Sequence, residues 1–261
     1  MNSRFRTILF DAGYTLVFPN VESLAEDLAR QGYPITVQDF HAAERGGKQK
    51  LDAWLLPRIA SHERVARPDL VYWQEYLRIL AKRLNLSWIA RVRFVSRVVK
   101  AFRNIQFWSR VEPCAEPFLE SLRDRGYRMG VVSNATGKMR EQLVRLDLAK
   151  HFDFIFDSAV VGIEKPSPAI FTMAAHAAGG KVSETLFVGD SYSIDVAGAA
   201  FADISGVLMD ASGAYAHRSS GISCPRITSL VGLDRILENS DGPGAGTLLA
   251  DAEECHARVL A

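Results

Sequence analysis

The sequence has few cysteines, almost no net charge and no long hydrophobic run. Its 261 residues contain 3 Cys, and 31 Lys and Arg against 30 Asp and Glu give a formal net charge of +1. An odd number of widely spaced cysteines argues against a disulfide framework and favours a reducing, cytoplasmic location. Because there is neither an apolar run of ~18 residues nor a signal-type segment, we expect no membrane partner. Near-neutral charge without a basic stripe argues against nucleic acid.

What the sequence does contain is an alternation of short apolar runs with amphipathic segments. The runs, bounded by Gly, Asp or Ser, predict buried parallel strands at 7–10, 129–132, 154–156, 186–188 and 206–209. The segments between them predict helices at 114–125, 137–148, 168–178 and 191–202. This pattern is typical of an α/β fold with a doubly wound parallel sheet, in which ligands bind beyond the carboxyl ends of the strands.

A long helical segment interrupts the alternation after the first strand. Residues 18–107 contain no convincing strand and carry 15 Lys and Arg against 9 Asp and Glu, a net +6. We therefore predict an α/β domain formed by 1–17 and 108–238, with 18–107 as an inserted helical domain. Residues 239–261 are expected to form a linker and a tail to which we assign no role.

Polar residues follow two of the predicted strands. Asp11 opens the segment Asp-Ala-Gly-Tyr-Thr-Leu, in which Gly13 allows a tight turn. Ser133 and Asn134 offer a hydroxyl and backbone N–H groups at the start of a helix, a pattern that suits an anion. Each of these signals alone is also typical of an ordinary turn or helix cap.

Two further loops complete the pattern. Lys165 precedes a Pro-led helix and could neutralise a phosphoryl group as a point charge. Asp190 ends a strand, and Asp195 lies in the first turn of the next helix. Carboxylates of Asp11, Asp190 and Asp195 in one crevice would repel one another and raise their pKa values unless a cation lay among them. Mg²⁺ fits best, because it prefers oxygen ligands and bridges to phosphate.

This ordered set of Asp, Ser, Lys and Asp motifs resembles the haloacid dehalogenase (HAD) superfamily, over about residues 5 to 237. The resemblance implies a Rossmann-like core with a helical cap of the small α-helical kind inserted after the first motif. It also implies that Asp11 is the nucleophile that becomes an aspartyl-phosphate.

The remaining site residues take their roles from the same resemblance. Asp11, Asp190 and the Gly13 carbonyl would bind Mg²⁺, and Asp195 would support the metal site or Lys165. Thr15 would steady the first loop. The phosphoryl oxygens would be held by Ser133, the Asn134 amide and Lys165. We therefore expect a Mg²⁺-dependent phosphatase of a small phosphorylated metabolite.

The sequence departs from the family pattern at Gly13. Family phosphatases usually have there a second Asp, which protonates the leaving group and then activates water, and losing such a group typically costs ~10² to 10⁴ in rate. A phosphatase would need its proton from a cap residue, water or the substrate itself.

Three alternatives to a phosphatase stay open. A phosphonatase-like enzyme would use a cap lysine, Lys48 or Lys50, as a Schiff base. A dehalogenase would use an Arg soon after the nucleophile, and the next one here is Arg30. A HAD-like protein without catalysis would serve as a phospho-ligand binder or interaction partner.

Overall fold

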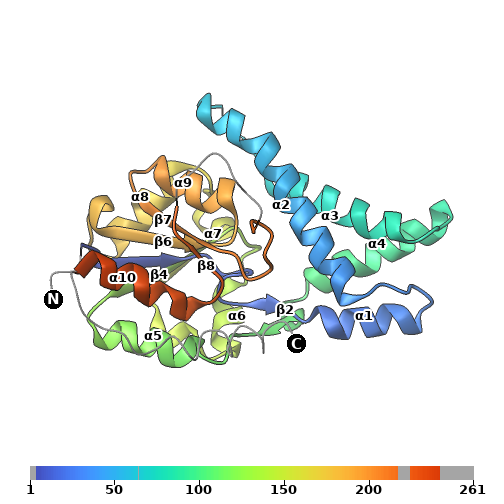
Figure 1. The fold of residues 1–261 in the computed structure, drawn as a ribbon, viewed down its shortest axis with the longest axis horizontal. Helices are drawn as coiled ribbons and strands as arrows, with labels where there is room; N and C mark the ends of the chain where they lie inside the picture. Colours follow the sequence, from blue (N-terminus) through green and yellow to red (C-terminus); the bar gives the residue numbers. More distant parts are fainter. Residues whose placement is uncertain (1–3, 64, 217–223, 242–261) are drawn as a thin grey trace. The chain divides into compact units, whose positions relative to one another are not determined.

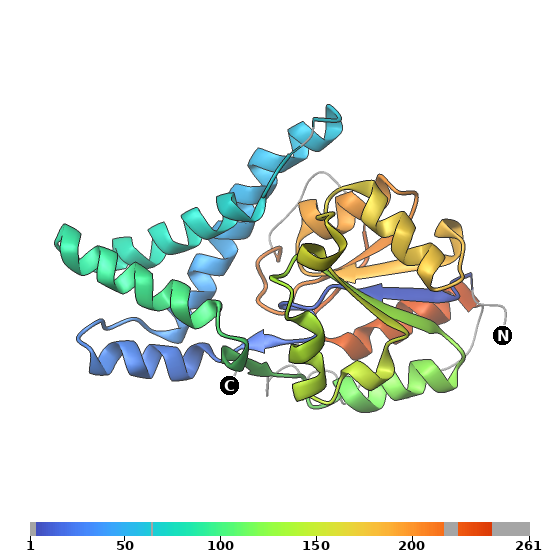
Figure 2. The same ribbon diagram turned by 180° about the vertical axis from the view of Figure 1, so that it is seen from behind.

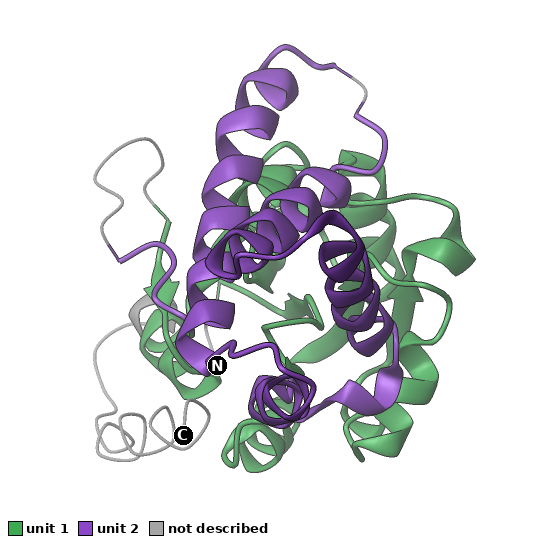
Figure 3. Ribbon diagram, turned by 90° about the vertical axis from the view of Figure 1, so that its right-hand side faces the viewer, with its two compact units in different colours: residues 1–18, 111–211, 218–261 green, residues 19–110, 212–217 purple. Residues whose placement is uncertain are grey.

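The computed structural model describes residues 4–63, 65–216 and 224–241. The chain divides into two compact units, shown in separate colours in Figure 3. Unit 1 comprises 1–18, 111–211 and 218–261, and unit 2 comprises 19–110 and 212–217. The expected linker and tail lie outside the described residues from 242 onward, whereas 239–241 belong to the last described helix.

Unit 1 is built on a parallel sheet of six strands in the order β5-β4-β1-β6-β7-β8. The apolar runs expected to form strands do so, with bounds within a residue of those predicted, and a short edge strand of two residues is added. The strands are β1 (Thr7–Phe10), β4 (Arg128–Ser133), β5 (Phe154–Asp157), β6 (Thr185–Gly189), β7 (Ser205–Met209) and β8 (Arg226–Ile227). The predicted α/β fold with a doubly wound parallel sheet is therefore confirmed.

Helices cover both faces of this sheet. In Figures 1 and 2, α8 (Pro168–Ala177) and α9 (Ala197–Ala200) lie on one face, and α5 (Ala115–Asp124) and α10 (Leu233–Asp241) lie on the other. Leu9, Phe171 and Phe187 belong to one buried apolar cluster, which joins β1, α8 and β6. Burial of these side chains fixes the two central strands, and with them the loops at their carboxyl ends.

The described part of unit 2 consists mainly of four α-helices, with a 3₁₀-helix at Ile105–Phe107 and most of a short ribbon. The helices are α1 (Val21–Arg30), α2 (Val37–Ala60), α3 (Asp69–Arg83) and α4 (Trp88–Phe102). Tyr76, Leu80 and Phe94 are fully buried in its apolar core. Where the sequence indicated no strand, β2 (Phe18–Pro19) and β3 (Trp108–Arg110) pair at the two ends of the insert.

One further detail differs from an expectation. Cys114 is disulfide-bonded. One bridge is compatible with an odd number of cysteines, so the cysteine count no longer supports a reducing location. Among the described residues, no helix combines the length and the hydropathy needed to cross a bilayer.

Candidate active site

The predicted site residues follow three neighbouring strands of the sheet. Asp11 comes directly after β1, Ser133 ends β4, and Asp190 comes directly after β6. Phe10 is in register with Val131 on one side and with Val188 on the other. Because these strands are parallel, their carboxyl ends bring the residues that follow them to one edge of the sheet.

Lys165 links two carboxylates at this edge. Its Nζ lies 2.5 Å from Asp11 Oδ1 and 2.7 Å from Asp195 Oδ1. Asp11 is 7% exposed and both Lys165 and Asp195 are 1% exposed, so water screens these charges little. The ammonium group of Lys165 therefore offsets part of the negative charge of the clustered carboxylates.

Burial sets the protonation behaviour of this group. Desolvation raises the pKa of Asp11 to about 6; the positive charge of Lys165 lowers it, and the negative charge of Asp195 adds to the rise. Burial alone would lower the pKa of Lys165, but the charges of Asp11 and Asp195 outweigh burial and raise it above its ordinary value. Lys165 is thus held as an ammonium group, and Asp11 is a carboxylate at neutral pH.

Asp195 is positioned by an unusual turn and by a glycine. The segment Tyr192–Val196 forms a π-helix, a feature found often at functional sites, where the sequence predicted an ordinary helix. Asp195 Oδ2 accepts a hydrogen bond of 2.9 Å from the Ser191 N–H. A Cβ atom at Gly189 would lie 2.5 Å from the Asp195 carboxylate, so only glycine permits this approach.

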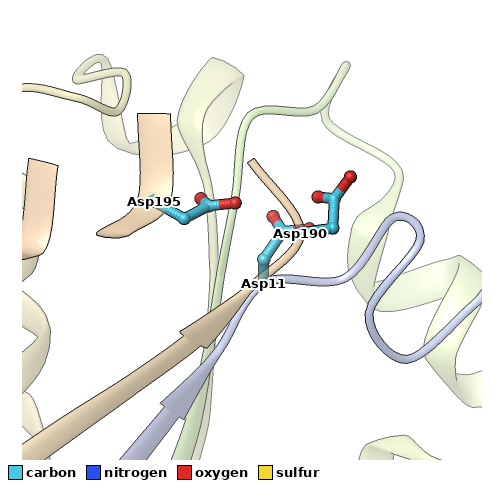
Figure 4. A group of neighbouring side chains, drawn as sticks. All are labelled: Asp11, Asp190 and Asp195. Carbon is cyan, nitrogen blue, oxygen red and sulfur yellow. The ribbon is translucent and has the colours of Figure 1, made fainter. Parts of the chain in front are cut away.

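Three carboxylates form a cluster that could hold a cation. Asp11, Asp190 and Asp195 each offer an oxygen, and these oxygens lie within 4.8 Å of one another (Figure 4). With Lys165 the four groups carry a formal charge of −2. An excess of negative charge among oxygen ligands suits Mg²⁺. The residues present therefore fit the metal that the sequence predicted.

The loop that follows Asp11 folds back on one carbonyl group. Ala12 O accepts from the N–H groups of Leu16 and Val17 at 2.9 Å each. Gly13 is partly exposed, and Tyr14 has a φ of 55°, in the left-handed region that favours glycine. Thr15 is fully buried, and its Oγ1 has no hydrogen-bond partner among the described residues.

Ser133 and Asn134 differ in what their side chains contact. Ser133 is 4% exposed at the end of β4. The Asn134 side chain donates to the Lys165 carbonyl at 2.9 Å and accepts from the Lys165 N–H at 2.8 Å. This side-chain amide is thus committed to the lysine loop.

The start of the helix that follows Asn134 is capped by a carboxylate. Asp157 Oδ2 accepts from the N–H groups of Gly137 and Met139, at 2.8 and 3.1 Å, just where α6 (Met139–Arg145) begins. That helix N-terminus is therefore not open to an anion, whereas the anion site expected at Ser133 and Asn134 stays a prediction. The sequence did not predict that Asp157 caps this helix, because an Asp at the end of a strand does not by itself show which backbone N–H groups it will contact.

The two cap lysines differ in burial within unit 2. Lys48 is 3% exposed, and its Nζ lies 2.8 Å from Glu44 Oε1, one turn earlier on α2. Lys50 is exposed. Arg30, the arginine weighed for a dehalogenase, is exposed and lies 3.5 Å from Asp27.

Comparison with known proteins finds one family and several relatives. Residues 5–203 match a model described as haloacid dehalogenase-like hydrolase. The glyceraldehyde 3-phosphate phosphatase of Methanothermobacter thermautotrophicus is 35% identical over 119 residues, which is 45% of this chain and 53% of that protein. The phosphoserine phosphatase of Thermus thermophilus is 40% identical over 99 residues, which is 38% of this chain and 40% of that protein.

The matches to these two phosphatases cover only part of each protein. They span about half of each curated relative or less. A solved L-2-haloacid dehalogenase has a TM-score of 0.60 at 21% identity, with 90% of this chain and 99% of that chain covered. At that identity the likeness concerns the fold.

Proposed function

The chain belongs to the haloacid dehalogenase-like hydrolase family, and from that premise we propose that it is a Mg²⁺-dependent phosphatase of a small phosphorylated metabolite. The observation that carries the proposal is the contact of Lys165 with both Asp11 and Asp195, in a cluster with Asp190. A buried nucleophile beside a fixed ammonium group suits attack on an anionic phosphoryl group. Similarity to proteins named as phosphatases of small phosphate esters supports the same substrate class.

The metal ligands in this proposal are Asp11, Asp190 and the Gly13 carbonyl. Asp195 already accepts hydrogen bonds at both oxygens, from Lys165 and from the Ser191 N–H, so it supports the site mainly by holding the lysine. When bound, Mg²⁺ would neutralise charge on the phosphoryl oxygens.

The chain's own residues then perform a double displacement. A carboxylate oxygen of Asp11 attacks phosphorus, the phosphorus–oxygen ester bond breaks, and the leaving alkoxide takes a proton. Water next attacks the aspartyl-phosphate, releasing inorganic phosphate and restoring the Asp11 carboxylate. Lys165, the Ser133 hydroxyl and the Asn134 N–H hold the phosphoryl oxygens during both steps. Thr15 steadies the loop that follows the nucleophile.

Gly13 leaves the proton to be supplied from elsewhere, because it has no side chain. Water, the substrate or another residue of the chain would supply it. Esters whose leaving groups need little protonation, such as aryl phosphates, should therefore react faster than alkyl phosphates by up to ~10² to 10⁴.

The alternatives have less support. The ion pair with Glu44 stabilises the ammonium form of Lys48, whereas a Schiff base requires the neutral amine. Arg30 is exposed and paired with Asp27, and three clustered carboxylates are better suited to a metal than to a dehalogenase site. A binding protein without catalysis would keep the same cluster of carboxylates but would not hydrolyse a phosphate ester.

Purified protein assayed on a panel of phosphate esters tests the proposal. Phosphate release that is abolished by EDTA, restored by Mg²⁺ and lost in Asp11→Asn supports it. Ligand binding without release would support the non-catalytic alternative. Release that persists in Asp11→Asn would exclude Asp11 as the nucleophile. Borohydride trapping with an aldehyde substrate should leave Lys48 and Lys50 unlabelled.

A further inference from the structure

Helix α4 of unit 2 begins with an exposed apolar cluster. Trp88, Ile89 and Val92 are 76%, 58% and 49% exposed. The turn between α3 and α4 forms one end of this unit (Figures 1 and 2). In the described part of unit 1, by contrast, the exposed large apolar residues lie on separate elements: Val144, Val160, Met173 and Phe201. Trp88, Ile89 and Val92 instead lie within five residues of one another, whereas single scattered apolar residues are normal on a protein surface.

Packing of unit 2 does not require this cluster. The residues of α4 that enter the core are Phe94, Val98 and Phe102, spaced by four. Trp88 and Val92 share a different stripe of the helix, also spaced by four. The side chains at the start of α4 are therefore available to a partner.

Positive charge surrounds the cluster and is not neutralised. Residues 76–111 contain nine Lys and Arg and no Asp or Glu. Four of these lie exposed on α4, and none forms an ion pair with any residue that the structure describes: Arg91, Arg93, Arg97 and Lys100. Other basic residues of unit 2 do form ion pairs, as Arg83 does with Asp39 at 3.1 Å. The near-zero net charge of the whole chain conceals this local excess.

We infer that the start of α4 docks on an anionic lipid bilayer. A tryptophan with two aliphatic side chains suits the boundary between headgroups and acyl chains, and flanking arginines attract anionic headgroups. This inference concerns a surface without a role in the proposed chemistry, and it revises our expectation of no membrane partner.

Two other occupants fit the cluster less well. A second copy bound across a two-fold axis would place Arg91 and Arg93 against the same basic residues of its partner. A nucleic acid could stack on Trp88 and contact the arginines, but it would leave Ile89 and Val92 without a role.

Flotation of the full chain with vesicles tests the inference. We expect binding to vesicles of phosphatidylcholine with about a third phosphatidylglycerol, weak binding to phosphatidylcholine alone, and release at high salt. Trp88→Ser should weaken vesicle binding about tenfold or more. The double variant Arg91→Glu/Arg93→Glu should do the same, because each basic residue near an anionic surface contributes about fivefold to the affinity. Val160→Ser is the matched control, because Val160 is 74% exposed on α7 (Ser158–Val161) of unit 1.

Tryptophan fluorescence locates the contact. Trp88 is exposed, whereas Trp54, Trp73 and Trp108 are partly buried, so the anionic vesicles should shift the emission to the blue in the native chain and not in Trp88→Phe. The inference is overturned by any of four results: no binding to the anionic vesicles, equal binding to both kinds of vesicle, equal loss in Val160→Ser, or Trp88-dependent dimers or oligonucleotide complexes without vesicle binding. None of these readouts depends on phosphatase activity.

Discussion

The side chain of Asn134 holds the backbone of Lys165 through two hydrogen bonds. Its Nδ2 donates to the Lys165 carbonyl at 2.9 Å, and its Oδ1 accepts from the Lys165 N–H at 2.8 Å. The two residues follow different strands, 31 positions apart in the chain. Asn134 thereby fixes the loop from which the lysine reaches Asp11, so a residue expected to bind substrate also positions the site's main positive charge.

Replacing Asn134 should reduce catalysis more than stability. Asn134→Ala removes two hydrogen bonds of about 1 kcal/mol each, which is on the order of a thirtyfold loss in kcat/KM if both act on the position of Lys165. Steady-state kinetics with a phosphate ester measures this loss. Asn104→Ala is the control, because Asn104 caps the Gln106 N–H at 3.0 Å in unit 2. Equal losses in both variants would contradict the role.

Gly189→Ala should displace the partner of Lys165. The new Cβ would lie 2.5 Å from the Asp195 carboxylate, which must then move away from the lysine. We expect kcat to fall about a hundredfold, since Lys165 would lose one of the two charges that orient it.

The control for this variant is Gly232→Ala. There the added Cβ would meet Ile227 side-chain carbons at 3.1 Å and the Ile227 Cα at 3.9 Å, so stability should change and catalysis should not. Comparison of kcat with thermal unfolding separates the two effects. A Gly189→Ala variant with unchanged kcat would show that the contact between Asp195 and Lys165 is dispensable.

The α/β pattern could be predicted because each part of it is local. Apolar runs such as 7–10 and 186–188, bounded by turn residues, are typical of buried central strands, and parallel strands bring Asp11 and Asp190 to one edge. Asp157 and the π-helix at Tyr192–Val196 were not predictable in this way. Each depends on which loop or side chain packs against it, and neither hydropathy nor residue spacing encodes that choice.

Glu112 should make stability depend on pH. It is 2% exposed, and its Oε2 accepts from the Leu230 N–H at 2.9 Å and from Ser229 Oγ at 3.3 Å. Burial raises its pKa from 4.5 to about 7, although these hydrogen bonds lower it. Between those pH values the folded chain holds a proton that the unfolded chain has lost, so the free energy of unfolding should fall as pH rises toward 7.

Glu112→Gln removes this dependence. The amide oxygen can still accept from the Leu230 N–H without carrying charge, so the variant should be more stable than the native chain above pH about 7 by ~1 to 3 kcal/mol. Urea unfolding on the acidic and the alkaline side of this window measures the difference. Glu26→Gln, at an exposed position on α1, should change nothing. If Glu112→Gln raised the free energy of unfolding equally at acidic and at alkaline pH, ionisation of Glu112 would not be the cause.

Gly13→Asp restores the carboxyl group that family phosphatases usually carry two residues after the nucleophile. If the native site lacks an acid there, the variant should raise kcat/KM for alkyl phosphates, by at most ~10² to 10⁴, and leave aryl phosphates nearly unchanged. The difference between the two esters is the informative quantity, because a general gain or loss would reflect folding or metal affinity. Unchanged rates with both esters would mean that the native chain already draws its proton from elsewhere. Loss of activity with both would mean that this turn, between Asp11 and the left-handed Tyr14, has no room for a second carboxylate.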